Sequence, residues 1–366
     1  MVDSIHVARW IAQFEPSEVE FTLFPSTPNR RVHSIIKEMM AKNGNIKIVP
    51  FGGKLSIPLW GMDLVFSDHV RGWLLRRMLK RDQPDFVHAL ELQHGGYITS
   101  RALEDTSIKT PFIATNYGSD IYWFQQFPRH LDKIKNLLAR ADRYSAECNR
   151  DVHLAMKLGF AGKVMPIVPN SGGRSDKDIP VKLSPLHERK MILVKGYQGW
   201  VGRASIALKA IQLSHHTLAG FEIVVYSANL KTKLLAKSIA SSTGLKITCY
   251  NKGSLSHNNM LQLFGEAYLY IGVSLSDGIS TSFLEATIYG ALTLQTFTSC
   301  VDEWLVASPE EFIISNFDAN QIAISINDMI RHPDKFQGLQ NSNRKHLMRK
   351  LDFDSVNSVA KEFYLE

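Results

Sequence analysis

The stretch SLSDGISTSFLEATIYGALTL, residues 274–294, carries the pattern that decides the fold. The apolar run 267–274 leads into it and predicts a buried strand, and Asp277 with Gly278 predicts a turn. The residues that follow repeat apolar and small side chains at helical spacing as far as Gly290, which predicts the end of a helix. Another apolar run comes next. Strand, turn, helix and strand in this order are typical of a parallel α/β unit.

The same alternation runs along the whole chain in two blocks. Further apolar runs predict strands at 19–26, 46–52, 85–90, 111–118, 163–170, 190–196, 221–227, 245–251, 291–297 and 311–316. A polar segment rich in Gly, Pro and Ser, 171–188, predicts a linker. We therefore expect two Rossmann-like domains, 1–170 and 189–345, whose parallel sheets face each other across a ligand cleft. The last segment, 346–366, is expected to form a C-terminal helix that returns to the N-terminal domain.

The first block opens in an unusual way, because its first periodic segment is a helix, 3–14, capped by Asp3 or Ser4. A Rossmann-like domain begins with its central strand, so the first strand is apparently missing. We expect that strand roughly 8 to 12 residues upstream, which would make Met1 an internal methionine, and the in-frame codons ahead of Met1 test this. The alternative is a fold that begins with a helix.

Composition limits the class of protein. With 45% hydrophobic and 21% charged residues, the chain is typical of a folded globular protein, and no stretch reaches the roughly 18 to 20 apolar residues that span a bilayer. The first residues lack a secretory-signal pattern, so we expect a cytoplasmic protein. Three isolated cysteines argue against a disulfide framework or a metal knuckle. The net charge of +7 is compatible with an anionic substrate or membrane surface, or with solubility alone, and no arginine-rich tract indicates nucleic acid.

The quoted stretch also carries the residues best suited to chemistry. Gly278 lets the backbone approach a ligand closely, and the hydroxyls and first-turn amides that follow form a ready phosphate site. Glu285, about one helical turn further on, can accept two hydrogen bonds from a vicinal diol such as ribose.

This segment resembles the E-x7-E signature of retaining glycosyltransferases of family 4, which have the GT-B fold and a usual form close to PSLYEGFGLPLLEAMACGCPVV. Asp277 stands in place of the first Glu, and Glu285 matches the second. Three further segments fall in the family's order: Pro84–Leu90, Gly118–Tyr122 and Ile167–Gly173. The resemblance covers nearly the whole chain.

The resemblance implies a metal-independent enzyme without a cofactor that moves a sugar from a nucleotide diphosphate sugar to a glycan or lipid-linked acceptor with retained configuration. The donor would bind the second domain and the acceptor the first. By the resemblance, Glu285 holds the donor ribose and Asp277 lies beside the donor sugar. The sugar and the diphosphate would be lined by Gly278, Ile279, Ser280 and Thr281.

A leaving diphosphate needs fixed positive charge when no metal is present. The loop after the strand at 190–196 offers Lys195 and Arg203 with Gly196 between them, and we expect both cations to bind the diphosphate. The family's cations lie about five positions apart, whereas these two lie further apart. The alternative is one phosphate ligand and one solvated charge.

In the first domain, residues at strand ends are candidates for binding the acceptor or the sugar. They are His6, His88, His94, Tyr117 and Asp120. Tyr117 occupies the position where the family often has a histidine, and it does not titrate near neutral pH. Asp120 is equally suited to capping a helix, and each histidine is equally open to a structural role.

The segment 71–83 predicts a helix with leucines on one face and Arg76, Arg77, Lys80 and Arg81 on the other, with Trp73 on the basic side. Such a helix can lie on an anionic membrane, which would place the protein at the inner face of the membrane. The alternative is a helix whose leucines simply pack on the sheet.

The leading hypothesis is a retaining glycosyltransferase of the hexosyltransferase type in surface polysaccharide or glycolipid assembly. The alternatives are a GT-B-type nucleotide-sugar epimerase and a catalytically silent nucleotide-sugar-binding protein. A dehydrogenase is disfavoured, because no G-x-G-x-x-G follows a strand. The nucleotide base, the sugar, the acceptor, the linkage and the oligomeric state are not encoded in any pattern we recognise.

Overall fold

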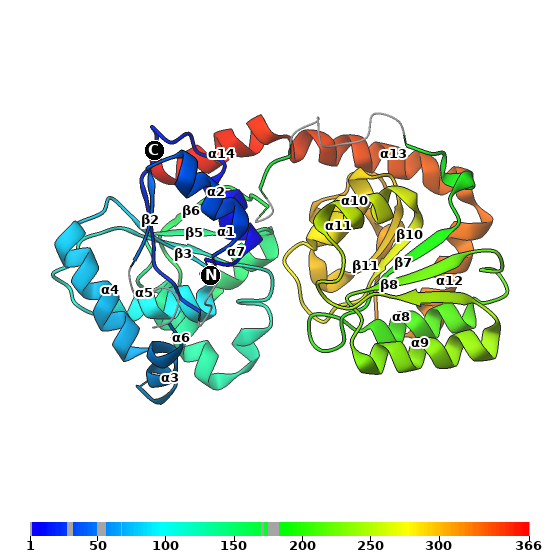
Figure 1. The fold of residues 1–366 in the computed structure, drawn as a ribbon, viewed down its shortest axis with the longest axis horizontal. Helices are drawn as coiled ribbons and strands as arrows, with labels where there is room; N and C mark the ends of the chain where they lie inside the picture. The colour runs from blue at the N-terminus through cyan, green and yellow to red at the C-terminus, as the bar shows by residue number, and fades with distance from the viewer. Residues whose placement is uncertain are drawn as a thin grey trace. The chain divides into compact units, whose positions relative to one another are not determined.

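The computed structural model describes residues 2–27, 32–49, 56–66, 68–169, 172–174 and 183–365. They form two compact units (Figure 1). Unit 1 comprises Met1–Arg174 and Leu351–Glu366, and unit 2 comprises Ser175–Lys350. Half of the expected linker at 171–188 lies outside the described residues. The boundary between the second domain and the C-terminal segment was expected after residue 345. It lies after Lys350 instead, because the helix Pro333–Lys350 runs through the expected position.

Unit 2 is built on one six-stranded, fully parallel sheet. Its strands are β7 (Met191–Lys195), β8 (Glu222–Tyr226), β9 (Lys246–Cys249), β10 (Ala267–Gly272), β11 (Leu292–Thr296) and β12 (Ile313–Ile314). Their spatial order is β12-β11-β10-β7-β8-β9, so the direction of winding reverses between β7 and β10. This is the doubly wound topology, and it places a topological switch point at the carboxyl ends of β7 and β10.

Helices cover both faces of this sheet. They are α8 (Ala204–Leu213), α9 (Leu230–Thr243), α10 (His257–Glu266), α11 (Thr281–Ile288), α12 (Ala319–Arg331) and α13 (Pro333–Lys350). Helices α8, α9 and α12 pack together on one face and α10, α11 and α13 on the other (Figure 1). Because both faces are covered, every residue of β10 is buried, which explains its continuous apolar run. Helix α11 stops at Gly290, whose φ of 82° is a conformation that favours glycine.

Unit 1 contains two parallel sheets instead of one. The strands β1 (Phe21–Leu23) and β2 (Ile46–Ile48) pair with each other. The second sheet has the order β3 (Val87–Leu90), β4 (Phe112–Thr115), β5 (Arg143–Ser145), β6 (Lys163–Val164). Among the described residues, no strand lies between β1 and β3.

Seven helices of four turns or fewer surround these strands in the described part of unit 1, together with the C-terminal helix. They are α1 (Ile5–Ile11), α2 (Ser34–Lys42), α3 (Ser56–Phe66), α4 (His69–Asp82), α5 (Tyr97–Ala102), α6 (Pro128–Leu138), α7 (Asn149–Lys157) and α14 (Phe353–Leu365). Ser4 caps α1, since its side chain accepts a hydrogen bond from the His6 amide.

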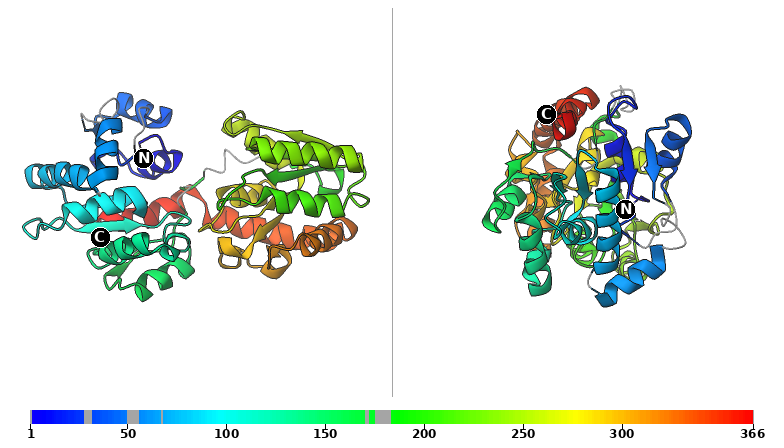
Figure 2. Two further views of the ribbon diagram at one scale, coloured as in Figure 1. Left: turned by 90° about the horizontal axis from the view of Figure 1, so that it is seen from below. Right: turned by 90° about the vertical axis from the view of Figure 1, so that its left-hand side faces the viewer.

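The C-terminal helix α14 belongs to unit 1, where it lies beside the first residues of the chain (Figures 1 and 2). Its Phe363 packs against Trp10 of α1 with ring centroids 4.8 Å apart. The indole Nε1 of Trp10 donates a 2.8 Å hydrogen bond to the Tyr364 hydroxyl. Burial of these aromatic rings fixes the helix to the sheet of unit 1.

Candidate functional site

The polar residues of unit 2 converge at the switch point, where β7 and β10 end side by side. Lys195 is the last residue of β7, and the loop after β10 carries Asp277. Lys195 Nζ lies 3.4 Å from Asp277 Oδ2 and 3.4 Å from Ser280 Oγ. The side chains that the sequence suggested for phosphate and for sugar therefore contact each other.

Lys195 is held as a buried cation, since only 9% of the residue is exposed. Burial of the ammonium lowers the pKa of Lys195, but the Asp277 carboxylate and the nearby Tyr270 and Tyr197 together outweigh burial, and the pKa is raised above its usual value. The lysine is therefore fully charged at neutral pH. A buried ammonium whose single carboxylate partner is at the long end of hydrogen-bond distance is suited to bind a further anion.

The N-terminus of α11 supplies further donors at the same place. Ser280 is its N-cap residue, and the Ser280 side chain makes no capping hydrogen bond. The first-turn amides of α11 therefore lack the usual acceptor from their own N-cap residue, and with the helix dipole they favour an anion. The Gly278 amide donates to Asp277 Oδ1 at 3.1 Å, which stabilises the turn. The Ile279 side chain is buried, so a bound ligand could contact this residue only through its backbone.

Glu285 lies in the second turn of α11 and is only 5% exposed. Its Oε1 lies 3.8 Å from Nε2 of His257, the first residue of α10. His257 could not be predicted from the sequence, because no local pattern shows that the start of α10 lies next to α11.

A buried polar network supports the loop that carries Asp277. Thr298 Oγ1 donates to the Ser274 carbonyl at 2.6 Å, and Gln295 Nε2 donates to Ser299 Oγ at 2.9 Å. The Ser274 and Ser299 hydroxyls lie 3.2 Å apart, and the Asp277 amide donates to the Thr298 carbonyl. The sequence analysis missed this network. Its signal is the unusual density of hydroxyl and amide side chains after a buried strand.

Arg203 is the other cation expected to bind the diphosphate, and it lies where α8 begins. Arg203 is the N-cap residue of α8, and its amide donates to the Val273 carbonyl at 2.7 Å. Among the described residues, no contact joins its side chain to Lys195. Lys195 Nζ lies 5.8 Å and Lys252 Nζ lies 5.7 Å from the centroid of the Tyr197 ring. Lys252, to which no sequence pattern pointed, therefore places a second cation near this tyrosine.

Gly196 serves the packing of the loop. Its amide donates to the Tyr226 carbonyl at 2.8 Å, and its carbonyl accepts from Thr232 Oγ1 at 3.3 Å. Both backbone groups are thus engaged inside unit 2.

In unit 1, polar residues gather at the carboxyl ends of β3 and β4. Asp120 Oδ2 accepts hydrogen bonds from the amides of Leu92 (2.8 Å) and Tyr117 (3.0 Å), which ties the two following loops together. Burial and the neighbouring Glu91 carboxylate raise the pKa of Asp120 well above its usual value. Glu91 itself has a positive φ of 114°, a strained conformation for a residue with a side chain.

His6 and Tyr117 meet at this end of the sheet, with ring centroids 5.7 Å apart in an edge-to-face arrangement. The Tyr117 hydroxyl is buried and has no hydrogen-bond partner among the described residues. Burial, followed by the charge of Glu147, raises the pKa of Tyr117 well above its usual value, so the hydroxyl stays protonated. It is available to hydrogen-bond a ligand that enters.

His88 has the structural role that the sequence left open. Its Nδ1 contacts the Tyr364 hydroxyl at 2.6 Å, and its Nε2 contacts Thr115 Oγ1 at 2.7 Å. Burial lowers the pKa of His88 to about 3, so the ring is neutral at physiological pH. Both ring nitrogens of His88 are thus engaged within unit 1.

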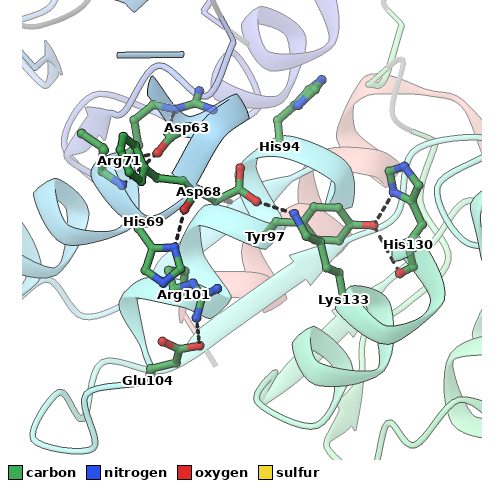
Figure 3. A network of polar contacts seen from close by, with 12 residues as sticks. Asp63, Asp68, His69, Arg71, His94, Tyr97, Arg101, Glu104, His130 and Lys133 are labelled. Atoms are coloured by element: carbon green, nitrogen blue, oxygen red, sulfur yellow. Dashed lines mark hydrogen bonds and ion pairs between the residues drawn. The ribbon is translucent and has the colours of Figure 1, made fainter. Parts of the chain in front are cut away.

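His94 differs, because it is exposed on a short π-helical turn, Leu92–Gly96. Figure 3 shows its side chain pointing away from the polar contacts below it. Those contacts fix the surrounding helices: Lys133 Nζ lies 2.7 Å from Asp68 Oδ2, and the Tyr97 hydroxyl lies 2.9 Å from His130 Nδ1 (Figure 3). His94 thus stands on a rigid support with its imidazole free to contact a ligand.

Helix α4 proves less basic on its surface than its sequence indicates. Its leucines pack inward on the sheet. Arg76 donates to the carbonyls of Ala102 (3.2 Å) and Arg101 (3.1 Å), and Lys80 forms a 2.6 Å ion pair with Asp105. Arg77 and Arg81 remain exposed. Apolar side chains of α3 and α4 are exposed as well: the exposed fractions are 75% for Val65, 55% for Phe66 and 51% for Trp73.

This apolar surface belongs mainly to α3 and surrounds a hollow of about 640 Å³ lined by Val65, Phe66, His69, Val70 and Trp73. The buried ion pair between Asp63 and Arg71 joins α3 to α4 beneath it (Figure 3). No described helix is long and apolar enough to cross a membrane.

Comparisons with known proteins place the chain by its fold. No protein-family model matches it, and no curated protein matches it in sequence. Among solved structures, Anabaena HepE in complex with UDP and glucose is similar over 99% of this chain and 96% of its own, with a TM-score of 0.69 and 13% identity. A glycosyltransferase from Rickettsia africae has a TM-score of 0.70 and 15% identity over 99% of this chain and 94% of its own.

Sucrose-phosphate synthase from Thermosynechococcus elongatus is similar to the same extent, with a TM-score of 0.71 and 12% identity over 98% of this chain and 91% of its own. At such identities the likeness shows the fold alone. The chain has the GT-B fold, with two Rossmann-like units in one polypeptide, as the sequence predicted.

Proposed function

We propose that this protein is a glycosyltransferase that moves a hexose from a nucleotide diphosphate sugar to an acceptor hydroxyl, with retained anomeric configuration. The observation that carries the proposal is the cluster of Lys195, Asp277 and Ser280 at the N-terminus of α11, where the N-cap side chain makes no capping hydrogen bond. A buried ammonium beside free helix amides is what a leaving diphosphate requires.

Each residue has a distinct role in this proposal. Lys195 and the α11 amides bind the diphosphate, and Lys252 adds a second cation near Tyr197. Glu285 accepts hydrogen bonds from the ribose diol, and Asp277 leaves Lys195 to accept a hydroxyl of the donor sugar. The anion that replaces Asp277 at Lys195 is the diphosphate itself, so the lysine keeps an anionic partner throughout.

The reaction breaks the bond between the anomeric carbon and the diphosphate oxygen, and the electron pair leaves with the diphosphate. The acceptor hydroxyl attacks from the same face, and its proton passes to the departing phosphate oxygen. Fixed cations stabilise the charge that develops on the diphosphate. We propose that the chain's own residues fill these roles and that no metal or cofactor takes part.

The names of the similar proteins support a UDP-linked donor as the first to test. Anabaena HepE was solved with UDP-glucose, and TarM of S. aureus with UDP and α-GlcNAc-glycerol. We assign the acceptor, a glycan or a lipid-linked sugar in surface polysaccharide or glycolipid assembly, to unit 1, where His6, His94 and Tyr117 offer groups for hydroxyls.

The apolar surface of α3 supports a membrane-associated acceptor. Val65, Phe66 and Trp73 are exposed together, and Arg77 lies over the Trp73 ring at 5.4 Å. An aromatic ring and a cation beside apolar side chains suit the boundary between lipid headgroups and acyl chains. We propose that this surface rests on the cytoplasmic face of an anionic membrane.

Sedimentation with vesicles of phosphatidylglycerol or phosphatidylcholine tests the membrane contact. The double variant Val65→Asp/Phe66→Asp should lose binding to the anionic vesicles, whereas Leu213→Asp, at an exposed leucine of unit 2, should keep it. Equal sedimentation of all three proteins would contradict the membrane contact and leave the transferase proposal intact.

Incubation with UDP-glucose and UDP-GlcNAc, followed by product analysis, tests the main proposal. A transferase releases UDP, an epimerase returns an isomerised donor, and a silent binding protein leaves the donor unchanged. Glu285→Gln should abolish donor turnover, whereas Glu266→Gln, at an exposed glutamate of α10, should not. Turnover of the donor that survives Glu285→Gln unchanged would contradict the assignment of the site.

A further inference from the structure

The two sheets of unit 1 end at β1 and β3, and these two strands face each other across a gap. Helix α1 covers the gap from one side, because its Val7, Ala8 and Ile11 form one apolar cluster that includes Leu23 of β1 and Leu90 of β3. From the other side, α4 and α5 pack against side chains at the end of β1 and the start of β3 in a second cluster. Since the same helices cover both strands, β1 and β3 lie in one layer.

The backbone of each strand turns unpaired groups toward the gap. In β3 the Val87 amide donates to Pro111, and the Glu91 amide donates to Thr115, so alternate residues face β4. The residues between them, His88 and Leu90, therefore direct their N–H and C=O groups to the opposite edge. No strand of the described chain pairs with that edge.

The same reasoning applies to β1. The Phe21 amide donates to Asn45, and the Val49 amide donates to the Leu23 carbonyl, so these residues face β2. Thr22 lies between Phe21 and Leu23 and directs its backbone groups into the gap. Two rows of backbone donors and acceptors thus face each other from opposite walls.

The space between the walls is a cavity of about 1170 Å³. It is lined by backbone and side chains of β1 and β3 and by apolar residues of the covering helices, among them Ile11, Leu75, Leu79 and Ile98. Protein interiors are close-packed, with few voids larger than a water molecule. Each buried backbone group left without a partner costs about 1 to 3 kcal/mol, so an empty slot between two strand edges is unfavourable.

We propose that this gap is a binding site for one extended peptide strand, apolar on both faces, that pairs in parallel with β1 and β3 and joins them into a single sheet. Only an extended backbone satisfies two facing strand edges at once, because it presents donors and acceptors on both of its sides. Apolar side chains on both faces match the helices above and below.

The occupant is a strand whose carboxyl end leads into Val2. Val2 lines the cavity and is buried, and its carbonyl accepts a 2.9 Å hydrogen bond from the His33 amide. Helix α1 begins at the carboxyl edge of the sheet, as the contact of His6 with Tyr117 shows. A strand parallel to β3 also ends at that edge, so the strand, α1 and β1 would form one βαβ unit.

Adding a strand ahead of Val2 tests the proposal. One variant carries five valines and isoleucines joined to Val2 through a Gly-Ser pair, matching the usual length of about five residues. The matched control carries Pro at the central position, which removes a donor from the middle of the strand. The parent protein is the reference.

The apolar extension should raise the melting temperature and slow hydrogen exchange of the Thr22, His88 and Leu90 amides by about tenfold or more. The Pro control should show neither effect. Equal exchange in all three proteins would overturn the proposal, and so would equal protection by the Pro control, because the effect would then not require strand pairing. Binding of UDP to unit 2 does not depend on this strand, so either result leaves the proposed function to its own test.

Discussion

In the proposed site, Asp277 and Lys195 should make opposite contributions to the binding of a diphosphate, and substituting them one at a time tests this. Asn at position 277 keeps the size of the side chain and can still accept from the Gly278 amide, but it removes the negative charge 3.4 Å from Lys195 Nζ. In the unaltered protein the diphosphate must displace that carboxylate. Asp277→Asn should therefore bind UDP more tightly while transferring sugar more slowly.

The size of the effect follows from the geometry. Two unit charges about 4 Å apart interact by about 4 kcal/mol at an effective dielectric constant of about 20. The Asp277 side chain is 23% exposed, and its own solvation offsets much of this, which leaves a net effect of about 1 kcal/mol. We expect the Kd for UDP to fall about fivefold in Asp277→Asn. Transfer should fall about 100-fold, because the contact to the sugar is lost.

Lys195→Met should act in the opposite direction. Hydrogen bonds to charged groups contribute about 1.5 to 3 kcal/mol, so UDP should bind about 30-fold more weakly. Lys246→Met is the matched control, because Lys246 lies in the same unit and pairs with Glu222 at 3.1 Å, but is 72% exposed. Isothermal titration with UDP at fixed ionic strength measures all three. The reasoning is refuted if Lys195→Met leaves UDP binding unchanged, or if Asp277→Asn weakens it.

Three further predictions concern positioning and stability. Thr298→Val removes the hydrogen bond to the Ser274 carbonyl and should reduce kcat for transfer with little change in KM. Thr298→Ser keeps the hydroxyl and should keep kcat near that of the parent. Equal kcat in the Val and Ser variants would exclude a positioning role for Thr298. Arg71→Met leaves the buried Asp63 carboxylate without its cation and should cost about 3 to 5 kcal/mol in urea unfolding, and a loss below about 1 kcal/mol would contradict the buried pair. The folded-state pKa of Asp120 is raised, so its contribution to stability is present at low pH and is lost as the pH rises. Asp120→Asn should therefore gain stability relative to the parent between pH 4 and pH 8. A constant difference in unfolding free energy across that range would show that the pKa is not raised.

Local pattern was sufficient to predict the elements and the fold class. The strand, turn and helix of residues 267–290 form as the alternation of buried and polar positions indicates, and Gly290 ends α11 through its positive φ. The doubly wound sheet of unit 2 follows from the same alternation, because parallel strands require a crossover between them. The leucines of α4 could be assigned to the core for the same reason.

Contacts between distant residues could not be predicted from local pattern. The pairing of Lys195 with Asp277 depends on β7 and β10 being neighbours, and the proximity of Lys252 to Tyr197 depends on two separate loops meeting. The sequence suggested Arg203 as a further diphosphate ligand, and the structure anchors its backbone to Val273 at the end of β10, a contact that no local pattern predicts.

Local sequence pattern and tertiary contacts specify different properties of this protein, and the reason is physical. The sequence by itself determined the fold class, because hydrophobic periodicity is a property of neighbouring residues and decides which segments become buried strands and covering helices. Only the tertiary structure decided the state of each polar group: that His88 has both nitrogens engaged, that Arg76 is tied to α5, and that β1 and β3 face a gap. Charge, pKa and hydrogen bonding depend on which atoms lie within a few ångströms, and those atoms come from distant parts of the chain.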